Sequence, residues 1–397
     1  MSDCDVKEFK LCELLKIYNG TKYDHLNKGD IPLYGSGGLM SHVDEALYSG
    51  EAILLPRKGT LSNIMYVNES FWTVDTMYYA VVNNKLADAF YLYSYLSQLD
   101  LSNLDSGSTL PSMTKSAYES IVVKLPDLKI QKTVATILFN IRKKLEINNQ
   151  INQELEAMAK TLYDYWFVQF DFPDQNGKPY KSSGGKMVYN PELKREIPEG
   201  WGVEKLDDLG TIVGGSTPTK SISDNFTKGG EGYSWITPND LSNNKGNKFI
   251  KNGEIDVTVR GLKDASLKLY PEGTVLMSSR APVGYLAIAT KELTTNQGFK
   301  SFIPDKEYDK NYIYYTLQNC LKVIEQNASG STFKEISATV LKDITIIQPN
   351  LDIVKKFEIT VSSINNYIRD NEVQNQELTQ LRDWLLPMLM NGQVKVE

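Results

Sequence analysis

Two long stretches of the chain carry apolar residues in alternating steps of four and three. The first covers 129–170 and the second 351–390, and this spacing predicts helices whose apolar stripe packs on another helix. At 1.5 Å per residue, the first helix would span on the order of 60 Å. The same two places of each stripe hold asparagine; the central stripe residues are Leu145, Asn148, Asn152 and Leu155 in the first helix and Ile368, Asn371, Asn375 and Leu378 in the second.

Shorter apolar runs alternate with turn residues elsewhere. In 1–128 they predict strands near 31–38, 52–59, 77–82 and 121–126, with one helix near 87–98. In 201–350 they predict strands near 233–238, 274–289, 299–304 and 344–349. Both parts are therefore expected to be mixed α+β domains.

The chain repeats itself. Residues 106–164 match residues 329–387 at a constant offset of 223 without a gap, and 16 of these 59 positions are identical. So long a fixed register indicates a tandem duplication. KLCELL (10–15) matches KLDDLG (205–210) at an offset of 195, so the second globular part is 223 − 195 = 28 residues longer.

These patterns predict a fold of class α+β with pseudo-two-fold symmetry. We expect a first domain at 1–128, a central helix at 129–170, a linker at 171–200, a second domain at 201–350 and a C-terminal helix at 351–390. The linker is long enough for the chain to double back, so the two helices can pair antiparallel as a coiled coil that separates the domains. The alternative is that each helix packs only on the core of its own domain.

Composition narrows the class of protein. No run of about 18 apolar residues occurs, and the N-terminus lacks the apolar segment of a signal peptide. Three scattered cysteines favour a cytoplasmic protein without disulfides or structural zinc. The formal net charge of −6 requires any nucleic-acid site to gather its basic groups on one face, or to share a partner's charge.

Several catalytic motifs are missing from the sequence. It has no GxxxxGK[ST] phosphate loop and no Pro-Pro-aromatic loop of a DNA amino-methyltransferase. Asp174, Glu192 and Lys194 are the residue types of a Mg²⁺-dependent nuclease, but they lie in the predicted linker and not on paired strands. A nuclease that uses these linker carboxylates is one alternative function.

Gly-rich loops and strand ends supply the candidate DNA-binding residues. Loops 34–38 and 214–218 offer unhindered backbone N–H groups and hydroxyls for phosphates, and basic side chains at 57–58 and 280 follow matching strands. The SGST tetrapeptides could bind DNA or cap a helix. The candidates are Tyr34, Gly35, Ser36, Gly37, Arg57, Lys58, Ser106, Ser108, Thr109, Ser216, Thr217, Arg280, Ser329, Ser331 and Thr332.

Taken together, the motifs resemble the specificity subunit of type I restriction–modification systems over nearly the whole chain. The resemblance lies in IPLYGSGG, LPRKGTLSNI, TVDTMYY, the tail NQINQELEAMAKTLYDYWFVQFDFP and the linker GKPYKSSGGKMVYNPELKREIPEGW. In the second half it lies in GGSTPTK, WITPNDL, SSRAPVGYLAIA, TNQGFKSFIP and ASGSTFKEIS. Within these motifs, Thr237 and Lys334 join the candidate DNA-binding residues.

The resemblance implies two target-recognition domains that each bind one half of a split, asymmetric sequence in double-stranded DNA. It implies that the helices hold these domains apart and bind two methyltransferase subunits, and that restriction subunits join the complex. The chain itself would have no catalysis and no cofactor, because S-adenosylmethionine, ATP and Mg²⁺ would be bound by the partners. A coiled-coil adaptor without DNA specificity remains the other alternative.

Overall fold

A computed structural model describes residues 6–101, 111–280, 282–330 and 334–390. The chain divides into two compact units, each of which is described by itself. Unit 1 comprises Met1–Glu146 and Gln376–Glu397, and unit 2 comprises Ile147–Asn375. Both long helices contribute residues to both units, so neither unit coincides with one of the predicted domains.

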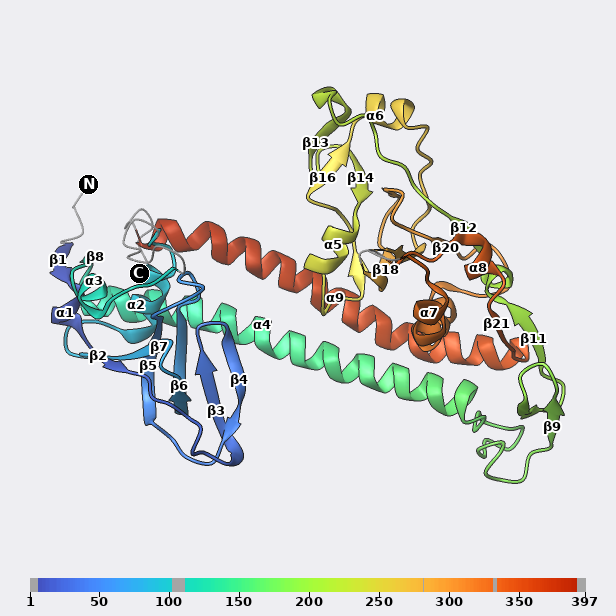
Figure 1. Ribbon diagram of the computed structural model, residues 1–397, viewed down its shortest axis with the longest axis horizontal. Helices are drawn as coiled ribbons and strands as arrows, with labels where there is room; N and C mark the ends of the chain where they lie inside the picture. The colour runs from blue at the N-terminus through green and yellow to red at the C-terminus, as the bar shows by residue number, and fades with distance from the viewer. Residues whose placement is uncertain (1–5, 102–110, 281, 331–333, 391–397) are drawn as a thin grey trace. The chain divides into compact units, whose positions relative to one another are not determined.

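Unit 1 is built on a six-stranded sheet in the order β2-β7-β5-β6-β3-β4. All neighbours are antiparallel except β3 and β6, which are parallel. Short helices and the start of α4 pack on the sheet (Figure 1), because strand residues such as Ile53 and Leu55 alternate toward this core. The strands are β2 (Leu15–Asn19), β3 (Lys28–Gly35), β4 (Gly38–Val43), β5 (Tyr48–Pro56), β6 (Met65–Thr73) and β7 (Met77–Val82).

The remaining elements of unit 1 close the domain. β1 (Lys7–Lys10) pairs with β8 (Val122–Leu125), so the two ends of the globular part meet. The helices are α1 (Leu11–Leu14), α2 (Ala89–Leu96) and α3 (Lys115–Glu119). The predicted helix near 87–98 is thus confirmed, and Asp88 caps it by accepting the backbone N–H of Tyr91.

Unit 2 contains two further sheets, in the orders β12-β20-β17-β18-β15 and β13-β16-β14-β19. Their strands are β12 (Thr211–Val213), β13 (Phe226–Lys228), β14 (Tyr233–Ile236), β15 (Phe249–Ile250), β16 (Ile255–Val257), β17 (Val275–Ser279), β18 (Val283–Ala289), β19 (Thr294–Thr295) and β20 (Ser301–Ile303). β11 (Gly202–Lys205) pairs with β21 (Thr345–Gln348), as β1 pairs with β8 in unit 1. Each half therefore closes through equivalent strands, as expected of a duplication.

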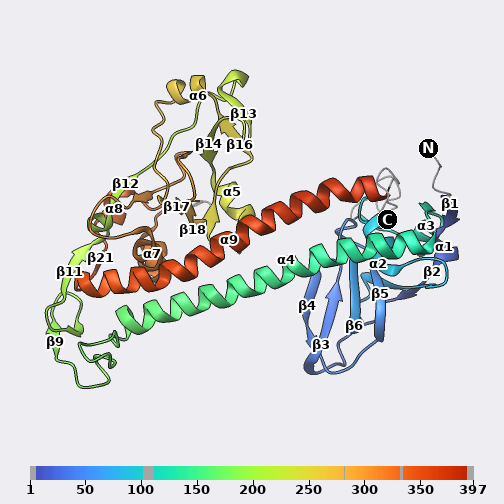
Figure 2. The same ribbon diagram turned by 180° about the vertical axis from the view of Figure 1, so that it is seen from behind.

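The further helices of unit 2 are η3 (Leu206–Leu209), η4 (Ser223–Asn225), α5 (Pro238–Asn243), α6 (Val259–Asp264), α7 (Lys310–Asn327) and α8 (Ala338–Lys342). Of these, α5 and α7 contact β18, and α6 contacts β16 (Figure 2). The helix α7 is the longest of these and was not predicted. Its buried residues, such as Tyr312, Tyr315 and Leu317, form one core with the facing parts of both long helices.

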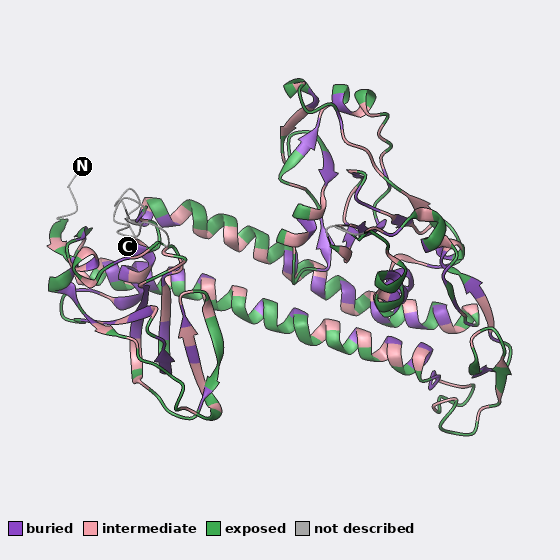
Figure 3. Ribbon diagram, viewed as in Figure 1, coloured by how far each residue is buried: buried purple, intermediate pink, exposed green. Residues whose placement is uncertain are grey.

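The long helices are α4 (Leu128–Tyr163), which continues as the π-helical turn η2 (Asp164–Val168), and α9 (Leu351–Met390). The α-helical part ends earlier than the predicted residue 170, and Phe170 ends the turn with a φ of 69°. This wider turn lets Trp166 and Phe167 contact the buried ring of Phe357. Figure 3 shows buried positions recurring along one side of each helix.

Within unit 2, the two asparagines of each stripe meet those of the other helix. The Asn148 amide donates to Asn375 Oδ1 at 2.9 Å, and the Asn371 amide donates to Asn152 Oδ1 at 2.9 Å. Because residue numbers rise along one helix as they fall along the other, these parts of α4 and α9 run antiparallel. Asn148 and Asn152 are buried, whereas Leu155, Asn371 and Asn375 are half-buried.

The predicted linker is ordered. The ring of Phe172 stacks on those of Tyr180 and Trp201, with centroids 4.7 and 5.0 Å apart. The guanidinium of Arg195 lies 4.8 Å from the centroid of Phe170. A small hairpin of β9 (Met187–Asn190) and β10 (Arg195–Pro198) completes the segment. Aromatic packing therefore fixes the path of this turn, which its Gly, Ser and Lys content did not indicate.

Replacing Phe357 with alanine is expected to destabilise unit 2 by about 3–5 kcal/mol, because a fully buried aromatic side chain would leave a cavity. Its ring contacts Tyr163, Trp166, Phe167 and Tyr315. The free energy of unfolding from urea titration measures the effect. The matched control is Ile359→Ala two residues along the same helix, where the side chain is 74% exposed and little change is expected. Equal effects of both substitutions would contradict the assigned core.

Candidate nucleic-acid interface

The central strands of the two units pair with their neighbours at equivalent positions. In unit 1, β5 pairs with β7 so that Ile53 is opposite Ala80. In unit 2, β17 pairs with β20 so that Val275 is opposite Phe302. β2 extends the first sheet beside β7, and β12 extends the second beside β20, both antiparallel. Positions in one unit can therefore be matched to positions in the other through their backbone hydrogen bonds.

Three separate segments of unit 1 meet at the ends of its strands. The strand β3 ends in a tight turn at Ser36-Gly37, where Gly35 pairs with Gly38 and Gly38 has a φ of 113°. The Asn63 amide donates to the Ser36 carbonyl at 2.8 Å, which joins this turn to the loop after β5. On the other side of that loop, the backbone of Lys58 bridges to Ser112, directly before α3.

Unit 2 gathers the corresponding segments. The backbone of Arg280, after β17, bridges to Glu335, and Arg280 Nη1 lies 3.8 Å from Glu335 Oε2. The Thr217 hydroxyl donates to the side-chain carbonyl of Gln297, so the loop after β12 meets the loop after β19. The Arg280 and Glu335 side chains are 36% and 43% exposed. A ligand can therefore reach both charges.

Backbone hydrogen bonds decide which basic residues correspond. The N–H of Arg57 donates to the Thr76 carbonyl, and the N–H of Ser279 donates to the Gly298 carbonyl in the same way. One residue later, Lys58 bridges to Ser112 as Arg280 bridges to Glu335. Lys58 is thus the counterpart of Arg280, and Arg57 corresponds to Ser279. The sequence had grouped Arg57 and Lys58 together.

One loop of this site was missed by the sequence analysis. The N–H of Thr21 donates to the Thr73 carbonyl at 2.9 Å, and the N–H of Ser216 donates to the Thr295 carbonyl at 3.1 Å. The indoles of Trp72 and Trp235 donate to the carbonyls of Thr21 and Ser216, each at 3.0 Å. Thr21 is therefore the counterpart of Ser216. The offset of 195 that links KLCELL with KLDDLG would have revealed the match if it had been followed six residues further.

The side chains of the predicted DNA-binding residues differ in the contacts that they make within the protein. The Tyr34 hydroxyl donates to Glu69 at 2.9 Å, and burial, followed by this carboxylate, raises the pKa of Tyr34 to about 12. The Arg57 guanidinium donates to the Asp75 carbonyl at 3.4 Å and lies over the ring of Tyr78. Lys58 is exposed and has neither of these contacts.

The hydroxyl of Thr237 is engaged in helix capping. It accepts the backbone N–H of Asp240 at 3.3 Å and donates to the Asp240 carboxylate at 2.6 Å. Ser329 exchanges backbone hydrogen bonds with Glu335, and Lys334 beside it is exposed. The predicted residues Ser106, Ser108, Thr109, Ser331 and Thr332 lie outside the described residues.

The linker carboxylates lie apart from any cluster of metal-binding type. Asp174 Oδ1 accepts the backbone N–H groups of Asn176 and Lys178, each at 2.8 Å, so this carboxylate holds a turn. Within residues 6–101, 111–280, 282–330 and 334–390, no three His, Cys, Asp or Glu side chains are grouped so that they could hold a metal ion. None of the helices in the same ranges is both long and apolar enough to cross a membrane.

The comparisons with known proteins identify the family of the chain. The family described as type I restriction modification DNA specificity domain matches residues 4–157 and 198–382. The chain is 38% identical over 205 residues to the type I restriction enzyme MjaIX specificity subunit of Methanocaldococcus jannaschii, which covers 49% of this chain and 46% of that protein. It therefore spans about half the length of that relative.

Two further relatives extend the comparison. The type I restriction enzyme HindI specificity subunit of Haemophilus influenzae is 28% identical over 337 residues, covering 72% of each chain. The crystal structure of the S subunit of a type I restriction-modification system from M. genitalium superposes with a TM-score of 0.62 over 98% of this chain and 97% of that one, at 14% identity. That structure supports the fold alone. The chain belongs to the family of type I restriction modification DNA specificity domains, whose members are non-catalytic specificity subunits.

Proposed function

We propose that this chain is the DNA-recognition subunit of a type I restriction–modification complex, and that it binds a split, asymmetric target. The observation that supports this most directly is the duplicated site. Each unit joins the loop after its central strand to the segment before α3 or α8, with Lys58 in one and Arg280 in the other at matched strand ends. A basic side chain there can donate to a guanine or a phosphate. Their neighbours Ser112 and Glu335 differ, so the two units would bind different half-sequences.

The expected domains enter this proposal as follows. Residues 1–128 and 201–350 are the two recognition domains, and 129–170 and 351–390 form an antiparallel coiled coil that holds them apart. The asparagine pairs that join Asn148 with Asn375 and Asn152 with Asn371 support this register. One chain with two similar but non-identical halves has pseudo-two-fold symmetry, which suits paired partner subunits around an asymmetric target.

The long helices also offer a surface for partner subunits. Apolar side chains that are well exposed recur along them: Ile147, Ile151 and Met158 on α4, and Ile359, Tyr367, Val373 and Trp384 on α9. Exposed apolar residues that recur in this way are typical of protein interfaces. We assign this surface to two methyltransferase subunits, with restriction subunits joining in the cytoplasm. Those partners would supply S-adenosylmethionine, ATP and Mg²⁺.

The adaptor and the nuclease remain the competing functions. An adaptor would have no use for matched cationic loops at the strand ends of both units, and a salt-dependent affinity of the assembled complex for one DNA sequence would exclude it. A nuclease would require Mg²⁺-dependent cleavage by the isolated chain. The hydrogen bonds that Asp174 makes within its own turn favour a structural role for this carboxylate.

Replacing Lys58 with alanine should weaken recognition of one half-sequence, and Arg280→Ala that of the other. A lost guanine contact costs about 1–3 kcal/mol, whereas a lost phosphate contact weakens all sequences alike and reduces the salt dependence. Arg57→Ala should have the smaller effect, because its guanidinium is held within the protein. Binding of the assembled complex to duplexes altered in one half measures each outcome.

Matched controls for these variants are Lys124→Ala in unit 1 and Lys205→Ala in unit 2. Both side chains are more than half exposed, at 65% and 56%, and each pairs with a surface carboxylate away from the loops. Neither control should change sequence preference. If the Lys58 and Arg280 variants behave like their controls, these residues do not belong to the interface.

Replacing Asp174 and Glu192 together with alanine should leave DNA cleavage by the assembled complex unchanged, because neither carboxylate is expected to hold a catalytic metal. Cleavage of a plasmid that carries the target measures this. Replacing Asp174 also removes two hydrogen bonds within its own turn. The melting temperature of the variant therefore shows whether the protein keeps its stability. Abolished cleavage with DNA binding and stability intact would support the nuclease.

Inserting seven residues into each long helix should lengthen the gap between the half-sequences. One insertion goes directly before Asn148 and the other directly after Asn375, because these two residues are hydrogen-bonded to each other. A heptad preserves the packing face and adds about 10 Å, which corresponds to roughly three base pairs of B-DNA. Mapped methylation sites with an unchanged gap would show that the helices do not set the distance. An insertion into α4 alone is the control and should impair assembly.

A further inference from the structure

Lys248 is a buried cation at the edge of the second recognition domain. It directly precedes β15, the edge strand that pairs with β18. Its carbonyl accepts the N–H of Ile288 at 2.9 Å, so its backbone belongs to the sheet. The residue is only 4% exposed. A lysine is almost never buried to this degree unless it is paired.

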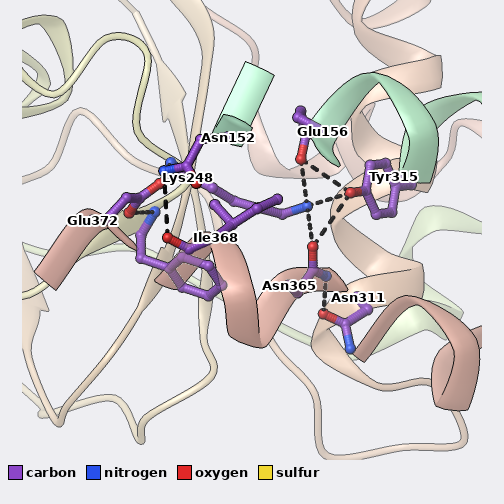
Figure 4. A network of polar contacts seen from close by, with 9 residues as sticks. Asn152, Glu156, Lys248, Asn311, Tyr315, Asn365, Ile368 and Glu372 are labelled. Carbon is purple, nitrogen blue, oxygen red and sulfur yellow. Dashed lines mark hydrogen bonds and ion pairs between the residues drawn. The ribbon is translucent and has the colours of Figure 1, made fainter. Parts of the chain in front are cut away.

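The ammonium group of Lys248 is surrounded by polar partners from three helices (Figure 4). It donates to Glu156 Oε2 of α4 at 2.9 Å and to Asn365 Oδ1 of α9 at 2.9 Å. It also donates to the hydroxyl of Tyr315 on α7. The ring centroids of Tyr314 and Tyr315 lie 4.3 and 4.0 Å from the nitrogen. One side chain of the domain therefore contacts both long helices.

A second contact fixes the same point of the sheet edge through its backbone. The N–H groups of Lys248 and Phe249 donate to the two carboxylate oxygens of Glu372 on α9, at 2.6 and 3.0 Å. A carboxylate that accepts two successive N–H groups constrains direction as well as distance. Asn365 is held in turn by donating to Asn311 Oδ1 at 2.6 Å. Asn365 of α9 therefore contacts the domain at two points, Lys248 and Asn311.

The charges of this cluster depend on one another. Burial lowers the pKa of Lys248 to about 8, while the Glu156 carboxylate acts in the opposite direction. Burial likewise raises the pKa of Glu372 to about 7, against the two N–H groups that it accepts. The nearby Glu372 carboxylate also acts to raise the pKa of Lys248. Removing this cation alone would leave Glu156, whose side chain is 28% exposed, without its ion-pair partner.

A cavity of about 560 Å³ lies beside the cluster, and its lining includes Glu156, Lys248 and Glu372 together with Tyr285 and Leu321. Phe249 of β15 and Ile368 of α9 belong to the same apolar core as α7. The polar cluster therefore acts beside this core, where the cavity leaves room for the sheet edge to tilt if the polar contacts are lost.

We propose that Lys248 is a positioning residue that fixes the angle of the second recognition domain on the helix pair. Through that angle it determines which gap between the two half-sequences the complex accepts. This inference rests on the proposed function. It concerns the distance between the two half-sequences, whereas Lys58 and Arg280 at the strand ends are proposed to recognise the bases or phosphates within each half-sequence. Lys248 acts through the helices and has no part in contacting bases.

The first recognition domain is attached to its helix by different chemistry. There the cation is Arg142 of α4, whose guanidinium lies 5.8 to 5.9 Å from the ring centroids of Tyr66, Phe90 and Tyr93. Cation–π contacts of this kind are less directional than hydrogen bonds from a carboxylate to two N–H groups. The Gln131 side chain of α4 also accepts the N–H of Asp88 at 3.0 Å, so uncharged hydrogen bonds add to these contacts in the first domain.

The test uses the double variant Lys248→Met with Glu156→Gln in the complete complex. It replaces the ion pair by neutral side chains of similar size, which is tolerated far better than removing one charge. The single variant Lys248→Met is measured beside it. The matched control is Lys245→Met, which replaces a nearby lysine whose ammonium lies over the ring of Tyr285. Binding is measured to duplexes that keep both half-sequences and vary the gap by single base pairs. The melting temperature of each variant is recorded.

The wild-type complex and the Lys245→Met control should prefer one gap. The double variant should lose about tenfold or more of this preference, within the usual range of coupling between sites, while its preference at each half-sequence is unchanged. An unaltered gap preference in a folded double variant overturns the proposal, and so does an equal loss of affinity for every gap. A wild-type complex without sequence-specific binding would instead refute the proposed function, before any variant is compared.

Discussion

The structure of unit 2 depends on the pairing of asparagines between the two long helices. An amide buried between helices costs free energy unless its donors and acceptors are satisfied. Asn148 and Asn152 of α4 meet Asn375 and Asn371 of α9, and the amide of Asn152 also donates to the Ile368 carbonyl at 3.4 Å. Sliding one helix by a turn would separate these partners. The same register brings Trp166 to Phe357 and places Glu156 and Asn365 around one ammonium group.

The two copies share one framework of strands and differ in the loops that follow these strands. The strand pairs β5–β7 and β17–β20 keep one register, and β1–β8 and β11–β21 close each half in the same way. At matched positions, however, Ser112 of one half corresponds to Glu335 of the other. Gly35 of the first half likewise stands where Thr237 caps α5, because Val74 and Asn296 donate equivalent hydrogen bonds to the preceding carbonyls.

Periodicity and internal repetition predicted much of this fold. The long helices, the asparagine stripe and fewer than half of the strands in the described residues follow from spacing alone, because each depends on residues close in the chain or on a constant offset. The ordered turn at Phe172, Tyr180 and Trp201 could not be predicted, because its stacked rings are separated in the sequence and follow no regular spacing. The contacts of Lys248 could not be predicted either. Its partners Glu156 and Asn365 are 92 and 117 residues away, and a lysine in an Asn- and Gly-rich stretch suggests solvent exposure.

The opposite placement of the two cations bears on how such chains can recombine. In the first half the helix carries the positive charge, and the domain meets it with the rings of Tyr66, Phe90 and Tyr93. The backbone N–H of Asp88 adds a hydrogen bond to Gln131 of the same helix. In the second half the domain carries Lys248 and the helices carry Glu156 and Glu372. A replacement first domain would therefore need aromatic rings near Arg142, whereas a replacement second domain would need a cation opposite Glu156.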